Sequence, residues 1–232
     1  MQETKLGKFS VILPNSKEYH SIKREVWGSD IYHFETEKDS PLIMDIGSHI
    51  GISVLYFKAI YPNSKIFAFE PHPISFSILE ENIFRNNLED VTAINKAIWS
   101  QNGNKALYID NTPNGWNSNT SFLEKSWTGK EQTKKVIVET TTLDKYLYDN
   151  VDMLKIDTEG SELAILKANE SILKRVSNIL IEYHPVKGSK PEDLLNILKR
   201  YFHIDIYFDG KPSKKIEKEK LLTIKGKNSK NS

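Results

Sequence analysis

The chain has 232 residues, which suffices for one α/β domain with appendages and is short for two. Its 32 basic and 31 acidic side chains nearly cancel, so the composition gives no reason to expect a nucleic acid or an anionic membrane as partner. The absence of cysteine excludes disulfides, thiolate metal sites and a cysteine nucleophile. No apolar run approaches the roughly 20 residues of a membrane helix, and the N-terminus lacks a signal peptide's apolar core, so we expect a cytoplasmic protein without membrane insertion.

The hydrophobic pattern changes near residue 41. Residues 1–40 hold short, polar-interrupted segments, which predict a small N-terminal strand or cap region. From residue 42 onward, short apolar runs alternate with segments of helical periodicity. Strands are expected at 42–46, 65–70, 91–98, 151–157 and 178–184, and helices at 52–61, 73–87, 162–168 and 191–202. This alternation is typical of βαβ units and a parallel sheet.

Residues 100–139 interrupt the alternation. Two expected strands, 103–110 and 134–143, flank a long polar loop that contains Trp116, which predicts an inserted hairpin and loop. Near the end of the chain, residues 203–208 and 220–226 are expected to form an antiparallel closing pair. The main domain should therefore span 41–225, with a basic, disordered tail at 226–232.

The segment from Asp45 to Gly51 joins the first strand of this domain to its first helix with the pattern D-x-G-x-x-x-G. Gly47 and Gly51 permit a tight turn and a close approach of a ligand to the backbone, and the helix N-terminus offers N–H groups. A dinucleotide site would have further glycines where Ser48 and Ile50 stand. An acid at the strand end suits a ligand with an ammonium group and no phosphate, which describes S-adenosylmethionine (SAM).

Glu70 ends the second strand of the domain, and Pro71 then breaks it. An acid at this place in a βαβ unit accepts hydrogen bonds from ribose hydroxyls. The alternative is a generic βαβ unit with a surface acid after each strand. Because Asp45 and Glu70 both stand in register with predicted strands, the pattern favours an adenosine-type cofactor.

Four ionisable residues lie near the ends of two later strands. Lys155 and Asp157 share one face of a strand, and Glu182 and His184 share one face of the next. If these strands are neighbours, the four groups converge where open α/β sheets bind ligands. Since a lone buried charge is costly, the simplest pairing is an ion pair between Lys155 and Glu182.

Transfer of a methyl group to oxygen requires an aligned hydroxyl and a group that takes its proton. His184, oriented by an acid, is the best-placed base, although it could also be a hydrogen-bonded histidine at a strand end. Asp157 and Glu159 could instead hold a divalent metal that orients a substrate oxygen, but no metal ligand is assigned. Glu159 could equally lie in the first turn of the next helix.

With these residues in view, the chain resembles the FkbM-type family of SAM-dependent methyltransferases between about Leu42 and Tyr201. The resemblance is carried, in the family's order and spacing, by "DIGSHIGISVLYF", "AFEPHPISFSILEENI", "TLDKYL", "VDMLKIDTEGSELAIL" and "ILIEYH". It implies a class I, Rossmann-like α/β fold: a doubly wound, mostly parallel seven-stranded sheet with an antiparallel last strand. Residues 41–225 would then be the methyltransferase domain.

The resemblance also implies roles for individual residues. Asp45, Gly47 and Gly51 would surround the methionine part of the cofactor, and Glu70 would bind its ribose. Polar positions at the rim of the active site correspond to Asp157, Glu159 and His184. His49 departs from the commoner family pattern, which has a smaller polar or amide residue, and it could touch cofactor or substrate.

Family members are generally taken to methylate hydroxyl groups, so the resemblance implies O-methylation of a sugar, a glycan or a small metabolite, with S-adenosylhomocysteine (SAH) as product. The Trp116 loop offers aromatic and amide groups of the kind that hold sugars. Methylation of RNA or of nitrogen is an alternative, but "DTEG" stands where amino-group methylation has an Asn/Asp-Pro-Pro-aromatic signature. An inactive binding scaffold is another, and a glycosyltransferase would leave the glycine turn unexplained.

Overall fold

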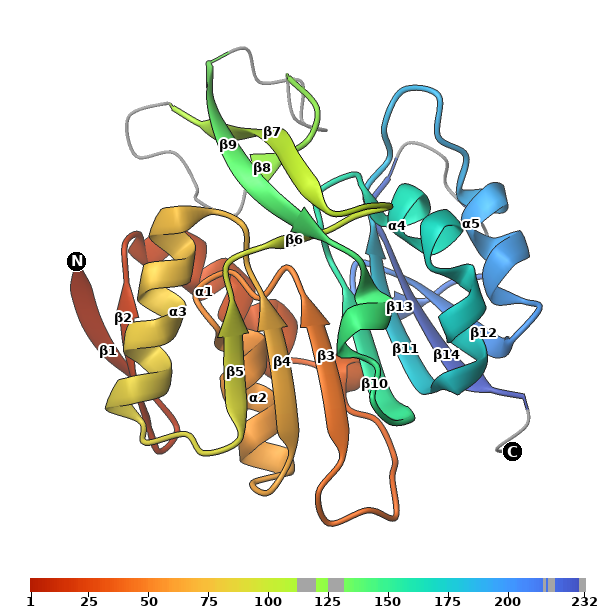
Figure 1. Cartoon of the computed structure of the whole chain (residues 1–232). Helices are drawn as coiled ribbons and strands as arrows, with labels where there is room; N and C mark the ends of the chain where they lie inside the picture. Colours follow the sequence, from red (N-terminus) through yellow and green to blue (C-terminus); the bar gives the residue numbers. More distant parts are fainter. Residues whose placement is uncertain (112–119, 125–131, 215, 217–219, 230–232) are drawn as a thin grey trace.

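The computed structural model describes residues 1–111, 120–124, 132–214, 216 and 220–229. At its centre lies one sheet with the strand order β13-β12-β14-β11-β10-β3-β4-β5 (Figure 1). Five adjacent strands run parallel, namely β11 (Val176–Tyr183), β10 (Val151–Ile156), β3 (Leu42–Ile46), β4 (Lys65–Phe69) and β5 (Val91–Ile94). The expected parallel sheet is therefore confirmed.

The last long strand, β14 (Leu222–Asn228), closes the sheet in the opposite direction. It pairs antiparallel with β11 on one side and with β12 (Phe202–Phe208) on the other. The seven-stranded arrangement with an antiparallel last strand is thus confirmed, and the two-residue β13 (Lys211–Pro212) is added at the edge of β12. Residues 226–228, which were expected in a disordered tail, form the end of β14.

Neighbouring residues of each strand point to opposite faces of the sheet, so both faces carry apolar side chains that must be buried. Helices cover both faces. Ile43, Met153 and Leu180 belong to one core, with α1 (Ser16–Trp27), α2 (Ile52–Ile60), α3 (Pro73–Arg85) and the short η1 (Asp30–Tyr32). Met44 and Leu154 belong to the other, with α4 (Glu162–Ala168), α5 (Pro191–Leu198), η2 (Leu143–Tyr146) and η3 (Glu170–Arg175). The result is a three-layer α/β/α fold.

The N-terminal region contains a helix that the sequence pattern did not predict. A hairpin of β1 (Gln2–Leu6) and β2 (Phe9–Leu13) is followed by α1 (Ser16–Trp27) and η1 (Asp30–Tyr32). Asn15 caps α1, since its side chain accepts hydrogen bonds from the N–H groups of Lys17 and Glu18. Tyr19 and Val26 bury the helix against the domain, so this region is part of the core.

In the segment expected to hold an inserted hairpin and loop, β7 (Gly103–Asp110) and β9 (Thr133–Thr141) form an antiparallel pair. It projects above the sheet in Figure 1. β8 (Thr120–Ser121) pairs with β7, and β6 (Ala97–Ile98) pairs with β9. The single strand expected at 91–98 is therefore wrong: β5 ends at Ile94, and β6 joins the second sheet. The Trp116 loop lies outside the described residues, and no helix within them is long and apolar enough to cross a membrane.

Candidate active site at the carboxyl ends of the strands

The turn between β3 and α2 requires both of its glycines. Gly47 has φ of +83°, and a Cβ atom on it would lie 1.7 Å from the backbone oxygen of Asp157. Gly51 has φ of +90°, and its Cβ would lie 2.7 Å from Cδ1 of Leu79. The N–H groups of Gly47 and Ser48 both donate to the carbonyl of Phe69, at 2.9 and 3.0 Å. The turn is thus fixed against β4 and β10 with only its backbone at the contact.

Asp45 lies beneath this turn. Its side chain is fully buried and lines neither of the cavities described below. Ser53 Oγ donates to its Oδ2 at 2.5 Å, and Lys155 Nζ lies 3.2 Å from its Oδ1. These contacts give Asp45 a structural role under the turn.

Glu70 follows β4 and is held by backbone amides. One carboxylate oxygen accepts from the N–H of His49 at 2.8 Å, and the other from the N–H of His72 at 2.7 Å. Burial raises the pKa of Glu70 to about 7, although the two amide hydrogen bonds favour its ionised form. The carboxylate therefore has a fixed position at the end of the strand, as expected, and titrates near neutral pH.

Lys155 joins three acceptors under the site. Its Nζ donates to the carbonyl of Gly47 at 2.7 Å and lies 3.2 Å from Asp45 and 3.3 Å from Asp157. Burial opposes its charge, but the carboxylates of Asp45 and Asp157 outweigh burial and raise the pKa of Lys155. The amine therefore stays protonated and binds the turn to the end of β10.

The expected ion pair between Lys155 and Glu182 is wrong. In the register of the parallel strands Lys155 lies opposite Asp45 on β3 and opposite Leu180 on β11, so Glu182 is two positions further along. Glu182 instead accepts a hydrogen bond of 2.7 Å from the hydroxyl of Tyr32 in η1. Burial raises the pKa of Glu182 well above its ordinary range, and the nearby Asp157 carboxylate adds to this effect.

His184 lies between two carboxylates. Its Nδ1 is 3.1 Å from Oε1 of Glu162, and its Nε2 is 3.5 Å from Oε2 of Glu159. Burial alone would favour the neutral ring, but Glu159 and Glu162 raise the pKa of His184 to about 10. At neutral pH the ring is therefore an imidazolium, which cannot take a proton from a hydroxyl. This argues against the base role predicted for His184.

His49, in contrast to His184, carries no charge at neutral pH. It adopts φ of 50°, and its Nε2 lies 3.5 Å from Oε1 of Glu18. Burial lowers the pKa of His49 to about 4, although the negative charge of Asp157 opposes the shift. The ring is thus a neutral group beside the glycine turn.

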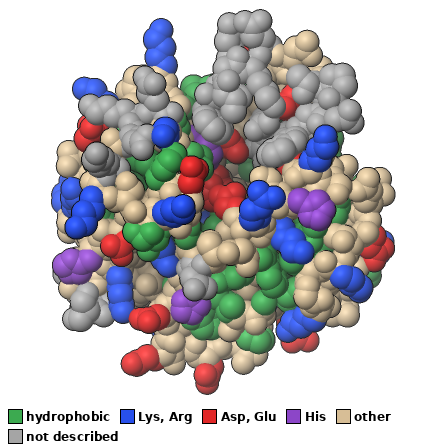
Figure 2. All heavy atoms as spheres, turned by 180° about the vertical axis from the view of Figure 1, so that it is seen from behind, with side chains coloured by type: hydrophobic (Ala, Val, Ile, Leu, Met, Phe, Trp, Pro, Cys, Tyr) green, Lys and Arg blue, Asp and Glu red, His purple; other side chains and the backbone are tan. Residues whose placement is uncertain are grey.

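Two cavities meet at these residues. One contains Glu70 and Pro71 and is bounded by the inserted hairpin; its apolar wall includes Phe69, Ile98, Leu107 and Phe122. The other lies beneath α1; its polar wall includes Ser21, Glu25, Tyr32, Lys155, Glu182 and His184. The residues that line both are Gly47, His49, Asp157 and Glu159. Figure 2 shows acidic side chains gathered in a hollow on the back of the molecule.

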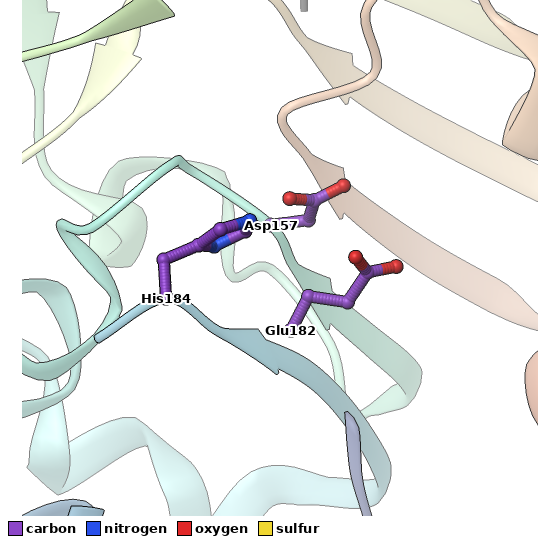
Figure 3. A group of neighbouring side chains, drawn as sticks. All are labelled: Asp157, Glu182 and His184. Carbon is purple, nitrogen blue, oxygen red and sulfur yellow. The ribbon is translucent and has the colours of Figure 1, made fainter. Parts of the chain in front are cut away.

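Asp157, Glu182 and His184 form a close group between β10 and β11 (Figure 3). One potential ligand atom of each lies within 4.8 Å of those of the other two, which is a spacing that suits a metal ion. Among the described residues, these three form the group of histidine and acidic side chains with a spacing that could hold a metal ion. The metal pair considered from the sequence was Asp157 with Glu159, whereas the structure groups Asp157 with residues of the neighbouring strand.

Three residues of the site had not been singled out from the sequence. Glu162 begins α4, where an acid is a common helix-start residue and so carries little signal. Glu25 and Tyr32 come from the N-terminal region and reach the site only through the packing of α1 and η1. An apolar stripe along residues 16–27 is the signal that would have predicted α1.

Comparison with known proteins gives consistent matches. A family model described as the methyltransferase FkbM domain matches residues 45–203. The chain is 30% identical over 201 residues to methyltransferase sdnD of Sordaria araneosa, covering 74% of this chain and 77% of that protein. It is 28% identical over 165 residues to hexuronic acid methyltransferase AglP of Haloferax volcanii, covering 71% and 63%. The crystal structure of methyltransferase FkbM from Methylobacillus flagellatus KT superposes with a TM-score of 0.58 at 16% identity, over 85% of this chain and 47% of that one.

Proposed function

Since the chain belongs to the FkbM family of SAM-dependent methyltransferases, we propose that it transfers a methyl group from SAM to a hydroxyl of a sugar, a glycan or a small metabolite. One observation carries the proposal: a cavity suited to an adenosine-type cofactor and a polar cavity share Gly47, His49, Asp157 and Glu159 as a common wall. Methyl transfer requires donor and acceptor to meet across such a boundary.

We assign SAM to the cavity beside the inserted hairpin. The glycine turn can pack this closely against Asp157 and Leu79 only because residues 47 and 51 lack a Cβ atom, and Gly47 and His49 of this turn line the cavity. Glu70, held by two amides, can still accept hydrogen bonds from ribose hydroxyls, and Pro71 with the apolar wall can take an adenine ring. When bound there, SAM supplies an electrophilic methyl group on a sulfonium.

The cavity beneath α1 would hold the acceptor. Because His184 is protonated, it cannot act as the base. We propose that Asp157 or Glu159, the carboxylates that line both cavities, accepts the proton of the acceptor hydroxyl. His184 would orient Glu159, and Lys155 would orient Asp157, through the ionic contacts described above. A positioned base contributes roughly 10²–10⁴-fold, and alignment of the hydroxyl often contributes more.

The acceptor class is supported by two considerations. AglP is by name a methyltransferase of a hexuronic acid, whose nucleophilic atoms are oxygens. In addition, the polar cavity presents Glu25, Asp157, Glu159 and Glu182, which would repel a phosphate backbone. Both observations favour a hydroxylated small molecule or glycan over RNA.

The test begins with calorimetric titration of the full-length protein with SAH, using NAD as control. We expect binding of SAH alone, followed by transfer of labelled methyl from SAM in a panel of hydroxylated metabolites and glycans. Glu70→Ala should weaken SAH binding at least tenfold, whereas Glu159→Gln should preserve it and lower turnover. Binding of SAH without transfer to any acceptor would support an inactive scaffold, and binding of neither nucleotide would refute the proposal.

A further inference from the structure

The register of the two central strands brings three metal-ligand residue types together. Ile156 at the end of β10 lies opposite Ile181 on β11, so the next residues, Asp157 and Glu182, continue side by side. His184 follows Glu182 by two positions and therefore emerges on the same side of the strand. Figure 3 shows the three side chains as neighbours, with the histidine ring beside the two carboxylates.

Each of these three side chains contacts a neighbouring side chain that orients it, and His184 contacts two, since its Nε2 also lies 3.5 Å from Oε2 of Glu159. Asp157 Oδ2 lies 3.3 Å from Lys155, and Glu182 Oε1 accepts from Tyr32 at 2.7 Å. His184 Nδ1 lies 3.1 Å from Glu162. Contacts of this kind, above all a carboxylate on the second nitrogen of a histidine, are typical of residues that surround a metal site and fix its ligands.

The partner of His184 is itself rigidly placed. Glu162 is 1% exposed, and its Oε1 accepts from the N–H groups of Thr158 and Gly160, at 3.1 and 3.0 Å. These bonds come from the segment that carries Glu159, so the acidic segment and the histidine are positioned together. The ring can hardly rotate without breaking this arrangement.

Acidic side chains outnumber cationic ones around the cavity. The carboxylates are those of Glu25, Asp157, Glu159, Glu162 and Glu182. The cationic groups of the described residues in this cavity are Lys155 and His184, which already contact some of these acids. Because gathering carboxylates away from water is costly, the cluster is stabilised by any further cation that enters it.

We propose that Asp157, Glu182 and His184 bind one divalent cation, which holds the hydroxyl of the acceptor. On binding, the cation takes the place of any proton on His184 and Glu182, because only the neutral imidazole and the ionised carboxylate are ligands. The inference rests on the proposed function only for the identity of that hydroxyl. Two carboxylates and one imidazole suit a divalent transition metal such as Mn²⁺ better than Mg²⁺, which prefers oxygen ligands, and three protein donors leave positions of an octahedral ion open for water and for the acceptor. The cation polarises the hydroxyl oxygen and so eases loss of its proton to Glu159.

The direct test is Mn²⁺ binding to the full-length protein, followed by electron paramagnetic resonance with and without SAH. Asp157→Asn and Glu182→Gln should each weaken Mn²⁺ binding at least tenfold. Glu25→Gln is the comparison variant: it removes a carboxylate of the same cavity that gives the metal no ligand atom but hydrogen-bonds to Glu182, and it should weaken Mn²⁺ binding less than either ligand substitution. Pulsed spectra should show coupling to an imidazole nitrogen that disappears in His184→Gln.

Two results would overturn the proposal. One is absence of Mn²⁺ binding in both the SAH-free and the SAH-bound protein. The other is equal weakening by Glu25→Gln, which would mean that the cavity attracts cations, such as an ammonium group of the acceptor, without a defined metal site. SAH affinity measured on the same samples separates this proposal from the proposed function, since a protein that binds SAH and no Mn²⁺ refutes only the metal site.

Discussion

Replacing Glu162 by glutamine should lower the pKa of His184 while leaving the fold intact. Glutamine keeps an oxygen for the N–H groups of Thr158 and Gly160 but removes the negative charge 3.1 Å from Nδ1 of His184. Loss of an opposite charge at this distance should lower the pKa of the ring by about 1–3 units from its value of about 10.

The same substitution should change how stability depends on pH. The ring binds its proton more tightly in the folded chain than at its ordinary pKa of 6.5, so its stabilising contribution is complete below pH 6.5 and is lost as the pH rises through about 10. The difference between these values corresponds to about 5 kcal/mol. In Glu162→Gln the loss should occur at lower pH and be about 1–4 kcal/mol smaller.

The assay is a titration of the imidazole ¹⁵N resonances between pH 5 and 11, combined with urea unfolding at both ends of that range. The control is Glu80→Gln, which removes an exposed carboxylate on α3 and should leave His184 unchanged. A wild-type His184 that titrates near 6.5, or a pKa that is equal in the wild type and Glu162→Gln, would refute the charge assignment of the site.

Three further predictions concern the turn and the two cavities. Gly47→Ala should abolish measurable SAH binding, because its Cβ would lie 1.7 Å from a carbonyl oxygen. Gly188 is the control, since it also has positive φ but has open space around it. Gly188→Ala should lower the unfolding free energy by only about 1–2 kcal/mol in thermal unfolding and should bind SAH normally. SAH affinity should fall as the pH is lowered through about 7, where Glu70 becomes protonated, and calorimetry of Glu70→Gln should show no such dependence. Tyr32→Phe should reduce the unfolding free energy in urea by about 1–3 kcal/mol, since it removes a hydrogen bond to buried Glu182; no loss would mean that another group satisfies that carboxylate.

Much of the architecture followed from local patterns. The period of the apolar residues predicted the parallel strands. The glycine turn and Glu70 were singled out because both follow predicted strands, and α/β sheets bind ligands at the carboxyl ends of their strands. The closing antiparallel pair was also predicted, since β12 and β14 each carry a recognisable strand pattern. These features depend on neighbours in sequence.

Features that depend on strand order and packing were not predictable in the same way. Lys155 had several acids within conceivable reach, and its partner was decided by the register that sets it opposite Asp45. Tyr32 and Glu182 are 150 positions apart, so the local sequence around either residue does not predict their hydrogen bond. The state of His184 likewise depends on Glu162, which reaches it from a separate helix.

The position of β14 has a consequence for the order in which the protein is made. The glycine turn and Glu70 belong to the first third of the sequence, and the contacts of the turn with Lys155 and Asp157 can form once β10 has been synthesised, before the last strand is added. The outer edge of β11, with Glu182 near its end, stays unpaired until residues 222–228 have been synthesised, because β14 is the strand that lies between it and β12. The acidic half of the site therefore matures last, and a nascent chain stalled before Leu222 would present an open strand edge that invites aggregation.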